Sequence, residues 1–204
     1  MSKVLLLNGS ARPKGATADA LRLIGQELNE RGVETTWFQL SNKPLRGCIA
    51  CGGCKRNGKN RCVFADDQCN ELIEAILDAD GVVIGTPTYF AGANGALTAL
   101  LDRVFFAATE PTQLFRGKVG AAVATCLRSG ATDAIDRLNK YFQFAAMPVA
   151  SSSYWNLLFA EDSPAGHDEK GINTLKELAV NILRGMAEFS YLYTRKLKTN
   201  TAYD

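Results

Sequence analysis

The sequence predicts a doubly wound α/β fold, in which five parallel strands in the order 2-1-3-4-5 form a sheet with helices on both faces. Continuous apolar runs such as residues 4–7 and 81–85 are typical of parallel strands that are buried on both sides. Segments with helical periodicity separate these runs, so strands and helices alternate along the chain. With 204 residues, 47% of them apolar, we expect residues 1–204 to form a single domain.

Each element is predicted from its local pattern and its flanking turn residues. We expect strands at residues 4–7, 33–40, 81–85, 118–126 and 149–155. We expect helices over residues 16–31, 67–79, 96–107, 132–145 and 171–192. Together these elements give the flavodoxin-like form of the doubly wound sheet, whose ligands bind where the carboxyl ends of the strands meet.

The loop after the first strand has the composition of a phosphate site. Residues 8–15 lead directly into a helix N-terminus, where free backbone N–H groups favour an anion. Ser10, Arg12, Lys14 and Thr17 add hydroxyl groups and positive charge. The loop matches neither the Walker pattern nor the G-x-G-x-x-G pattern. It therefore suits a single terminal phosphate, as in FMN, and the alternative is a simple βα turn.

Two further loops are predicted at the same edge of the sheet. Residues 86–95 follow the third strand and carry Tyr89 and Phe90, which could hold a planar ring by stacking. Residues 127–130 follow the fourth strand. We expect these loops to complete one ligand site with the phosphate loop.

The most specific motif is a run of four cysteines with the spacing C-x2-C-x2-C-x7-C, in a cysteine-rich loop at residues 43–68. The run consists of Cys48, Cys51, Cys54 and Cys62. Closely spaced thiolates in one run are nearer to the pattern of a [4Fe-4S] cluster than to the paired C-x2-C units of zinc sites. The alternatives are free thiols without a metal, a zinc site or a redox disulfide.

The cysteine run lies in a basic part of a nearly neutral chain. Every charged side chain between residues 41 and 65 is basic: Lys43, Arg46, Lys55, Arg56, Lys59 and Arg61. The net charge of the whole chain is only +2, which argues against a general nucleic-acid or membrane binder. The basic segment could stabilise thiolates or dock an acidic electron-transfer partner, or it could be an ordinary solvated loop.

The cellular location of the protein and the roles of the two remaining cysteines are predicted from simpler patterns. The apolar run at residues 4–7 is too short for a secretory signal, and no apolar stretch approaches the ~20 residues that span a membrane. We therefore expect a cytoplasmic protein, where structural disulfides are rare. Cys69 and Cys126 are predicted to be packing residues, and His167 is assigned no catalytic role.

Several of these segments resemble the NADPH-dependent FMN reductase family. The resemblance lies in residues 8–12 with Gly15 and Thr17, in residues 86–90, and in Leu97 with residues 101–103. The cysteine run, followed by Val63 and by acidic residues at 66–67, resembles the iron–sulfur flavoprotein branch of that family, as does the Trp-Asn pair at 155–156. The resemblance covers nearly the whole chain.

The resemblance implies FMN as a cofactor and names its binding residues. It implies phosphate contacts from Ser10, Arg12, Gly15, Ala16 and Thr17, ring contacts from Pro87, Thr88, Tyr89 and Phe90, and contacts near the pyrimidine edge from Ser129 and Gly130. It implies Cys48, Cys51, Cys54 and Cys62 as ligands of a [4Fe-4S] cluster close to the flavin. Two departures stand out: Ala16 replaces a frequent Asn or Ser, and the seven-residue gap before Cys62 is long.

The combined prediction is an FMN-dependent oxidoreductase that passes electrons between FMN and an iron–sulfur cluster. No catalytic side chain is assigned, because the cofactors carry the chemistry. The alternatives are a cluster-free NAD(P)H-dependent quinone, azo or flavin reductase, and a non-enzymatic flavodoxin-like electron carrier. The expected partners are NAD(P)H or a ferredoxin-like donor and a small-molecule acceptor, in a homodimer or homotetramer.

Overall fold

A computed structural model describes residues 2–56, 58–109, 113–160 and 168–199, with side chains described up to residue 189. His167 therefore lies outside the described residues. The strands are β1 (Lys3–Asn8), β2 (Glu34–Gln39), β3 (Gly81–Tyr89), β4 (Gly92–Ala93), β5 (Val119–Cys126) and β6 (Leu157–Phe159). The helices are α1 (Ala16–Asn29), α2 (Gly53–Arg56), α3 (Cys69–Leu77), α4 (Gly95–Thr109), α5 (Ala131–Phe144) and α6 (Glu169–Thr199). The described helices include no segment long and apolar enough to cross a membrane.

The doubly wound parallel sheet is confirmed, but the predicted count and order of strands are wrong. The sheet has six strands, with the path β2-β1-β3-β5-β6 and the short β4 paired antiparallel with β3. The additional strand arises because β3 runs on to Tyr89 and folds back through Phe90 and Ala91, both at positive φ. This tight turn makes a hairpin of a segment that the sequence predicts to be an irregular loop.

The last strand also lies later in the chain than predicted. Val149 forms only an isolated bridge with Gly120, and the strand pairing with β5 is made by β6. The intervening serines bond locally instead: the Ser152 hydroxyl donates to the Tyr154 carbonyl at 2.7 Å and also bonds Asn156. Such side-chain to backbone bonds compete with a strand ladder, which moves the regular pairing past residue 156.

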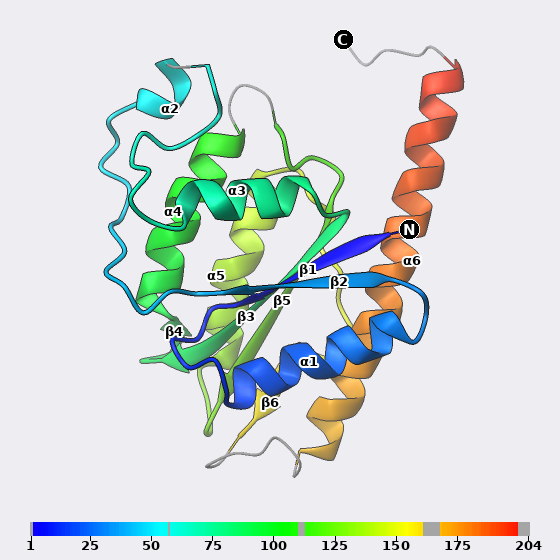
Figure 1. Ribbon diagram of the computed structural model, residues 1–204. Helices are drawn as coiled ribbons and strands as arrows, with labels where there is room; N and C mark the ends of the chain where they lie inside the picture. The colour runs from blue at the N-terminus through cyan, green and yellow to red at the C-terminus, as the bar shows by residue number, and fades with distance from the viewer. Residues whose placement is uncertain (1, 57, 110–112, 161–167, 200–204) are drawn as a thin grey trace.

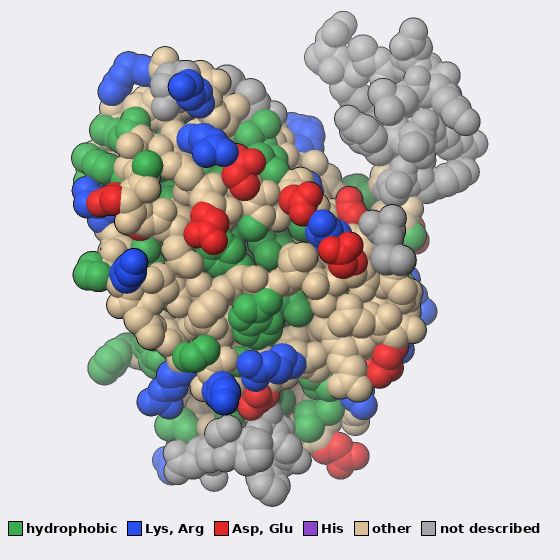
Figure 2. All heavy atoms as spheres, viewed as in Figure 1, with side chains coloured by type: hydrophobic (Ala, Val, Ile, Leu, Met, Phe, Trp, Pro, Cys, Tyr) green, Lys and Arg blue, Asp and Glu red, His purple; other side chains and the backbone are tan. Residues whose placement is uncertain are grey.

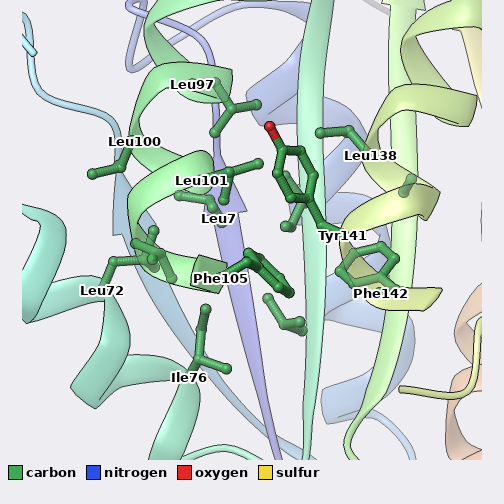
Figure 3. Packing of buried hydrophobic residues seen from close by; sticks show 14 of the residues in the cluster. Leu7, Leu72, Ile76, Leu97, Leu100, Leu101, Phe105, Leu138, Tyr141 and Phe142 are labelled. Carbon is green, nitrogen blue, oxygen red and sulfur yellow. The ribbon is translucent and has the colours of Figure 1, made fainter. Parts of the chain in front are cut away.

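Two helical layers cover the sheet, as Figure 1 shows. α1 and α6 pack on one face, and their buried side chains form one cluster with Val4, Leu6 and Val83. α3, α4 and α5 pack on the other face around Leu7. In Figure 3, Phe105 of α4 points toward Tyr141 and Phe142 of α5 and packs beside their rings. The two layers leave the carboxyl ends of the strands open at one edge.

Candidate functional site

A cavity of about 550 Å³ opens at the carboxyl edge of the sheet. It lies between the loop after β1, the end of β3 and the end of β5, as the sequence predicts for a ligand of a doubly wound sheet. Its lining consists of Ser10, Arg12, Gly15, Ala16, Thr17, Pro87, Thr88, Tyr89, Thr125, Cys126, Leu127 and Ala160. The structure thus brings together all the predicted phosphate contacts and three of the four predicted ring contacts.

One end of this cavity is built to receive an anion. Gly15 precedes the first turn of α1 with φ 148°, a conformation that favours glycine, and no side chain caps the helix. The first backbone N–H groups of the helix therefore have no partner within the helix and face the loop. The Ser10 hydroxyl oxygen accepts a bond from the Arg12 N–H at 3.1 Å, which leaves its proton available for a ligand.

The aromatic hairpin borders the other end of the cavity. Tyr89 lines the cavity and is 50% exposed, whereas Phe90 is fully exposed and does not line it. Ser129 and Gly130 are not lining residues either. Gly130 has φ 81°, and a Cβ there would lie 2.7 Å from the Ala91 Cα. The loop after β5 therefore supports the hairpin from behind.

Three lining residues lie outside the loops that the sequence predicts for the site: Thr125, Cys126 and Ala160. Thr125 and Cys126 end the strand β5, so the rule that ligands bind at carboxyl ends of strands could have identified them. The Thr125 hydroxyl bonds the Thr17 hydroxyl at 2.8 Å, which joins the end of β5 to the first turn of α1. Cys126 is buried as predicted, but it also borders the cavity.

The Thr88 hydroxyl provides a polar group for a ligand. Its oxygen is buried and has no hydrogen-bond partner among the residues that the structure describes. Because unpaired buried hydroxyl groups are unfavourable, a polar ligand atom or water in the cavity would stabilise it.

The four cysteines of the predicted run line a second, smaller pocket. Its volume is about 20 Å³, and Ile49, Val63, Phe64, Phe106 and Ala107 supply apolar walls. Cys48 and Cys51 are exposed, whereas Cys54 and Cys62 are half-buried. Figure 2 shows Lys and Arg side chains over the surface formed by α2 and this loop, as the charge pattern predicts.

A buried arginine holds the carboxyl end of the cysteine loop. The Arg103 guanidinium comes from α4, is almost fully buried and pairs with the Asp67 carboxylate. Its Nε and Nη2 atoms each lie 3.3 Å from the Cys62 Sγ atom. Arg103 also donates to the Arg46 and Phe64 carbonyls, so a single side chain spans both ends of the loop.

Burial and charge shift several pKa values around this arginine. Burial raises the pKa of the Cys54 thiol and raises that of Cys69, which lies beneath the loop, to about 12. Burial would also raise the pKa of Asp67, but hydrogen bonds from Arg103 and the Cys69 N–H, with the charge of Arg103, lower it. Asp67 and Arg103 are therefore an ion pair at neutral pH, and Cys69 is a neutral packing thiol.

The donor chemistry of the cysteine pocket fits a thiolate-bound iron–sulfur cluster, because four thiols line one pocket beside a buried cation. Within the described residues, no group of three or more Cys, His, Asp or Glu side chains is arranged to hold a metal ion. Binding would therefore have to draw the thiols together, and the exposed Cys48 and Cys51 have room to move.

The cysteine pocket is separate from the carboxyl-edge cavity. The two sites share no lining residue. The loop leaves β2 at the carboxyl edge but then runs along α4 to Arg103 and Phe106. Phe106 is eleven residues from Gly95, where α4 begins, so about 16 Å along the helix axis separates these two residues. Figure 1 shows α2 and the first turn of α1 at opposite ends of the molecule.

Comparison with known proteins identifies the family. Residues 2–162 match the sequence profile of NADPH-dependent FMN reductases. The chain belongs to this family. As an NADPH-dependent FMN reductase by family, it is an FMN-dependent oxidoreductase.

Proteins similar to this chain include some that are named for an iron–sulfur cluster. The chain is 34% identical to the iron-sulfur flavoprotein MJ1083 of Methanocaldococcus jannaschii, over 74% of this chain and 77% of that protein. It is 30% identical to the iron-sulfur flavoprotein of Methanosarcina thermophila, over 87% of this chain and 91% of that protein.

Solved structures share the fold at lower sequence identity. RosB with a bound riboflavin-phosphate intermediate matches 100% of this chain and 89% of its own, with a TM-score of 0.72 and 14% identity. The flavoenzyme FerB from Paracoccus denitrificans matches 93% of this chain and 99% of its own, with a TM-score of 0.68 and 18% identity. These likenesses support the flavodoxin-like fold.

Proposed function

We propose that this FMN-dependent oxidoreductase exchanges electrons between FMN in the carboxyl-edge cavity and a [4Fe-4S] cluster in the cysteine pocket. The observation that carries the proposal is the convergence of Cys48, Cys51, Cys54 and Cys62 on one pocket beside the buried Arg103. The names of the iron–sulfur flavoprotein relatives support it independently. A flavin takes up two electrons as a hydride whereas a cluster moves one, so the pair would convert between the two kinds of donor.

The FMN phosphate is assigned to the loop and helix end formed by Ser10, Arg12, Gly15, Ala16 and Thr17. The N–H groups of the first turn of α1, which no side chain caps, and the Arg12 charge are the supporting observations. Because Ala16 has no polar side chain, its contribution would come from the backbone. Pro87, Thr88 and Tyr89 would then contact the ring, with Phe90, Ser129 and Gly130 acting from outside the cavity lining.

The cysteine pocket would hold the cluster by four thiolates, and Arg103 would offset part of their negative charge. When bound, the cluster supplies one-electron transfer. The basic surface around Lys55 and Arg56 would face an acidic protein partner such as a ferredoxin-like donor. NAD(P)H is the alternative donor, and a small molecule is the expected acceptor.

Assembly is part of the proposal. We assign residues 1–204 to one flavodoxin-like domain with a cysteine-rich loop at 43–68, assembled as a homodimer or homotetramer. Exposed aromatic side chains near the carboxyl edge, including Tyr89, Phe90 and Trp155, support an interface there. The separation of the two sites along α4 gives a second reason. In an oligomer, the cysteine pocket of one copy could lie closer to the cavity of a neighbouring copy than to the cavity of its own chain.

Two other functions make different predictions. A cluster-free NAD(P)H-dependent quinone, azo or flavin reductase would oxidise NAD(P)H steadily with a small acceptor and contain no iron. It is favoured by the absence of a ready metal-binding group among the described side chains. A non-enzymatic electron carrier would be reduced only by a protein donor.

Anaerobic purification with iron analysis and a visible spectrum tests the proposal. We expect FMN together with about four irons per chain and broad absorbance beyond the flavin bands. Cys51→Ser should remove that absorbance and leave FMN bound, because Cys51 does not line the flavin cavity. Anaerobically reconstituted protein that holds FMN without iron would rule out the cluster and leave the simple reductase.

A further inference from the structure

Two glutamine side chains, Gln39 and Gln68, lie between the phosphate loop and the cysteine loop. Gln39 is the last residue of β2, and Gln68 immediately precedes α3. Neither side chain lines the carboxyl-edge cavity or the cysteine pocket. We call the two side chains the glutamine bridge.

On one side, Gln39 fixes the carbonyl groups of the phosphate loop. Its Nε2 atom donates to the Ser10 carbonyl at 2.7 Å, and its Oε1 atom accepts from the Asn8 Nδ2 atom at 2.8 Å. Asn8 lies opposite Gln39 in the register of β1 and β2, and its Nδ2 atom also donates to the Arg12 carbonyl at 3.1 Å. With these carbonyls bound by amide groups, the loop can keep its N–H and hydroxyl groups directed toward an anion.

On the other side, Gln68 binds the backbone that follows β2. Its Nε2 atom donates to the Gln39 carbonyl at 3.0 Å, and its Oε1 atom accepts from the Ser41 N–H at 2.6 Å. This paired bonding resembles that of a neighbouring strand. Gln68 occupies the N-cap position of α3 but makes no capping bond with that helix. Its side chain instead bonds the backbone at the end of β2.

The residue before Gln68 connects the bridge to the cysteines. Asp67 pairs with Arg103, whose guanidinium contacts the Cys62 Sγ atom. A continuous chain of contacts therefore runs from Cys62 through Arg103, Asp67 and the glutamine bridge to Ser10.

We propose that the glutamine bridge couples the two sites, so that occupation of the phosphate loop by FMN restrains opening of the cysteine loop. This inference rests on the proposed function for the position of the FMN phosphate. Gln39 and Gln68 act as positioning residues, because they touch the loops and neither pocket. Thermodynamic linkage makes the effect reciprocal: ordering the cysteine loop strengthens FMN binding by the same factor.

The first test separates phosphate binding from ring binding. In Gln39→Met, the side chain keeps its length but cannot bond the Ser10 carbonyl, so we expect FMN affinity to fall about tenfold. Riboflavin affinity should stay unchanged, because riboflavin lacks the phosphate. Gln143→Met, at an exposed glutamine of α5, is the matched control and should alter neither affinity.

The second test measures amide hydrogen exchange over residues 43–68 in full-length protein, without FMN and with saturating FMN. In the wild type we expect FMN to slow exchange of this segment severalfold. In Gln68→Met, measured at FMN saturation, the slowing should disappear while exchange at residues 9–17 is still slowed. Gln68→Glu, which can accept from Ser41 but cannot donate to the Gln39 carbonyl, should show an intermediate effect.

Each outcome separates the bridge from the phosphate site. If wild-type protein binds riboflavin as tightly as FMN, the proposed phosphate site is wrong. If wild-type protein prefers FMN but Gln39→Met keeps that preference in full, the site stands and the bridge is overturned. Undiminished slowing of residues 43–68 in both Gln68 variants, or no slowing in the wild type, also overturns it.

Discussion

The phosphate loop and the cysteine loop both carry a candidate site, but the protein orders them to different degrees. In the phosphate loop, Asn94 binds the Gly9 carbonyl at 2.8 Å, and Asn8 accepts from the Ser10 N–H at 3.1 Å. These bonds come from neighbouring strands and turns and add to those of Gln39. The backbone of the phosphate loop is thus bound on several sides before any ligand arrives.

The cysteine loop is anchored chiefly around Cys62 and the residues after it, with one further bond from Arg103 to the Arg46 carbonyl. The Asn70 side chain bonds both the N–H and the carbonyl of Cys62, and Arg103 contacts its sulfur. Cys48 and Cys51, at the other end of the run, are exposed. The comparison shows that one site is preorganised, whereas the other holds one thiol in place and leaves two thiols free to adjust.

Removal of the Arg103 charge should have the largest effect, because it removes the main anchor of the cysteine loop. In Arg103→Met, the nearly buried Asp67 carboxylate loses its partner, so we expect a loss of about 3–5 kcal/mol in the free energy of unfolding. Urea unfolding followed by circular dichroism measures it. Arg137→Met, which breaks an exposed pair with Asp102, should cost less than about 1 kcal/mol. Equal losses in both variants would refute the anchoring role.

Arg12→Ala tests the phosphate loop, which is the preorganised site. Loss of one charge-assisted hydrogen bond should weaken FMN binding by about 1.5–3 kcal/mol. Titration of flavin fluorescence measures this, and riboflavin binding serves as the internal control. An equal loss for riboflavin would show that Arg12 acts on the ring or on the fold instead of the phosphate.

The thiol beneath the cysteine loop predicts how alkali affects the fold. The folded-state pKa of Cys69 is raised to about 12, so its contribution to stability is complete below the pKa of the unfolded thiol, about 8.5, and is lost as pH rises toward 12. At pH 10.5 the wild type should lose roughly 2.5 kcal/mol more than Cys69→Ala, relative to pH 8. Unfolding curves for the two proteins at both pH values measure the difference. If the wild type and Cys69→Ala lost equal free energy of unfolding between pH 8 and pH 10.5, Cys69 would ionise as easily in the folded protein as in the unfolded one.

The smallest predicted effect concerns the hairpin at the edge of the cavity. Ala91 has φ 58°, a left-handed conformation that is unfavourable for a residue with a Cβ. Ala91→Gly should therefore raise the free energy of unfolding by about 1 kcal/mol. Ala93→Gly, in the paired strand β4, is the control and should lower it. A thermal unfolding scan of both variants distinguishes the two signs.

The sequence predicts the sheet and the phosphate loop well because both depend on local patterns. The apolar runs of β1, β3 and β5 locate the buried strands, and the small residues from Gly9 to Gly15 locate the loop at their carboxyl edge. The resemblance to FMN reductases adds the flavin. Nothing in the run of residues 86–95 marks Phe90 and Ala91 as a tight turn, because neither is a residue that favours positive φ.

The position of the cysteine pocket could not be predicted, because it depends on a contact between distant segments. Chain order places the loop after β2, at the edge where the flavin is expected. The loop instead follows α4 because Arg103, 36 residues after Asp67, pairs with it within the protein core. The sequence shows Arg103 only as part of a family motif, and the chain pattern gives no partner for it.

The Gln68 side chain bonds the Gln39 carbonyl and the Ser41 N–H, so the two ends of the intervening segment lie side by side. We call this pairing the stem. Besides this short stem, the contacts of Arg103 and the Asn70 bonds to Cys62 hold the described part of residues 42–67 to the rest of the protein. Once the stem has formed, the entropy of closing the loop changes slowly with loop length. We therefore expect that residues 42–67 can be replaced without loss of the fold. A protein with a shorter or cysteine-free segment that keeps both ends of the stem should still fold and bind flavin.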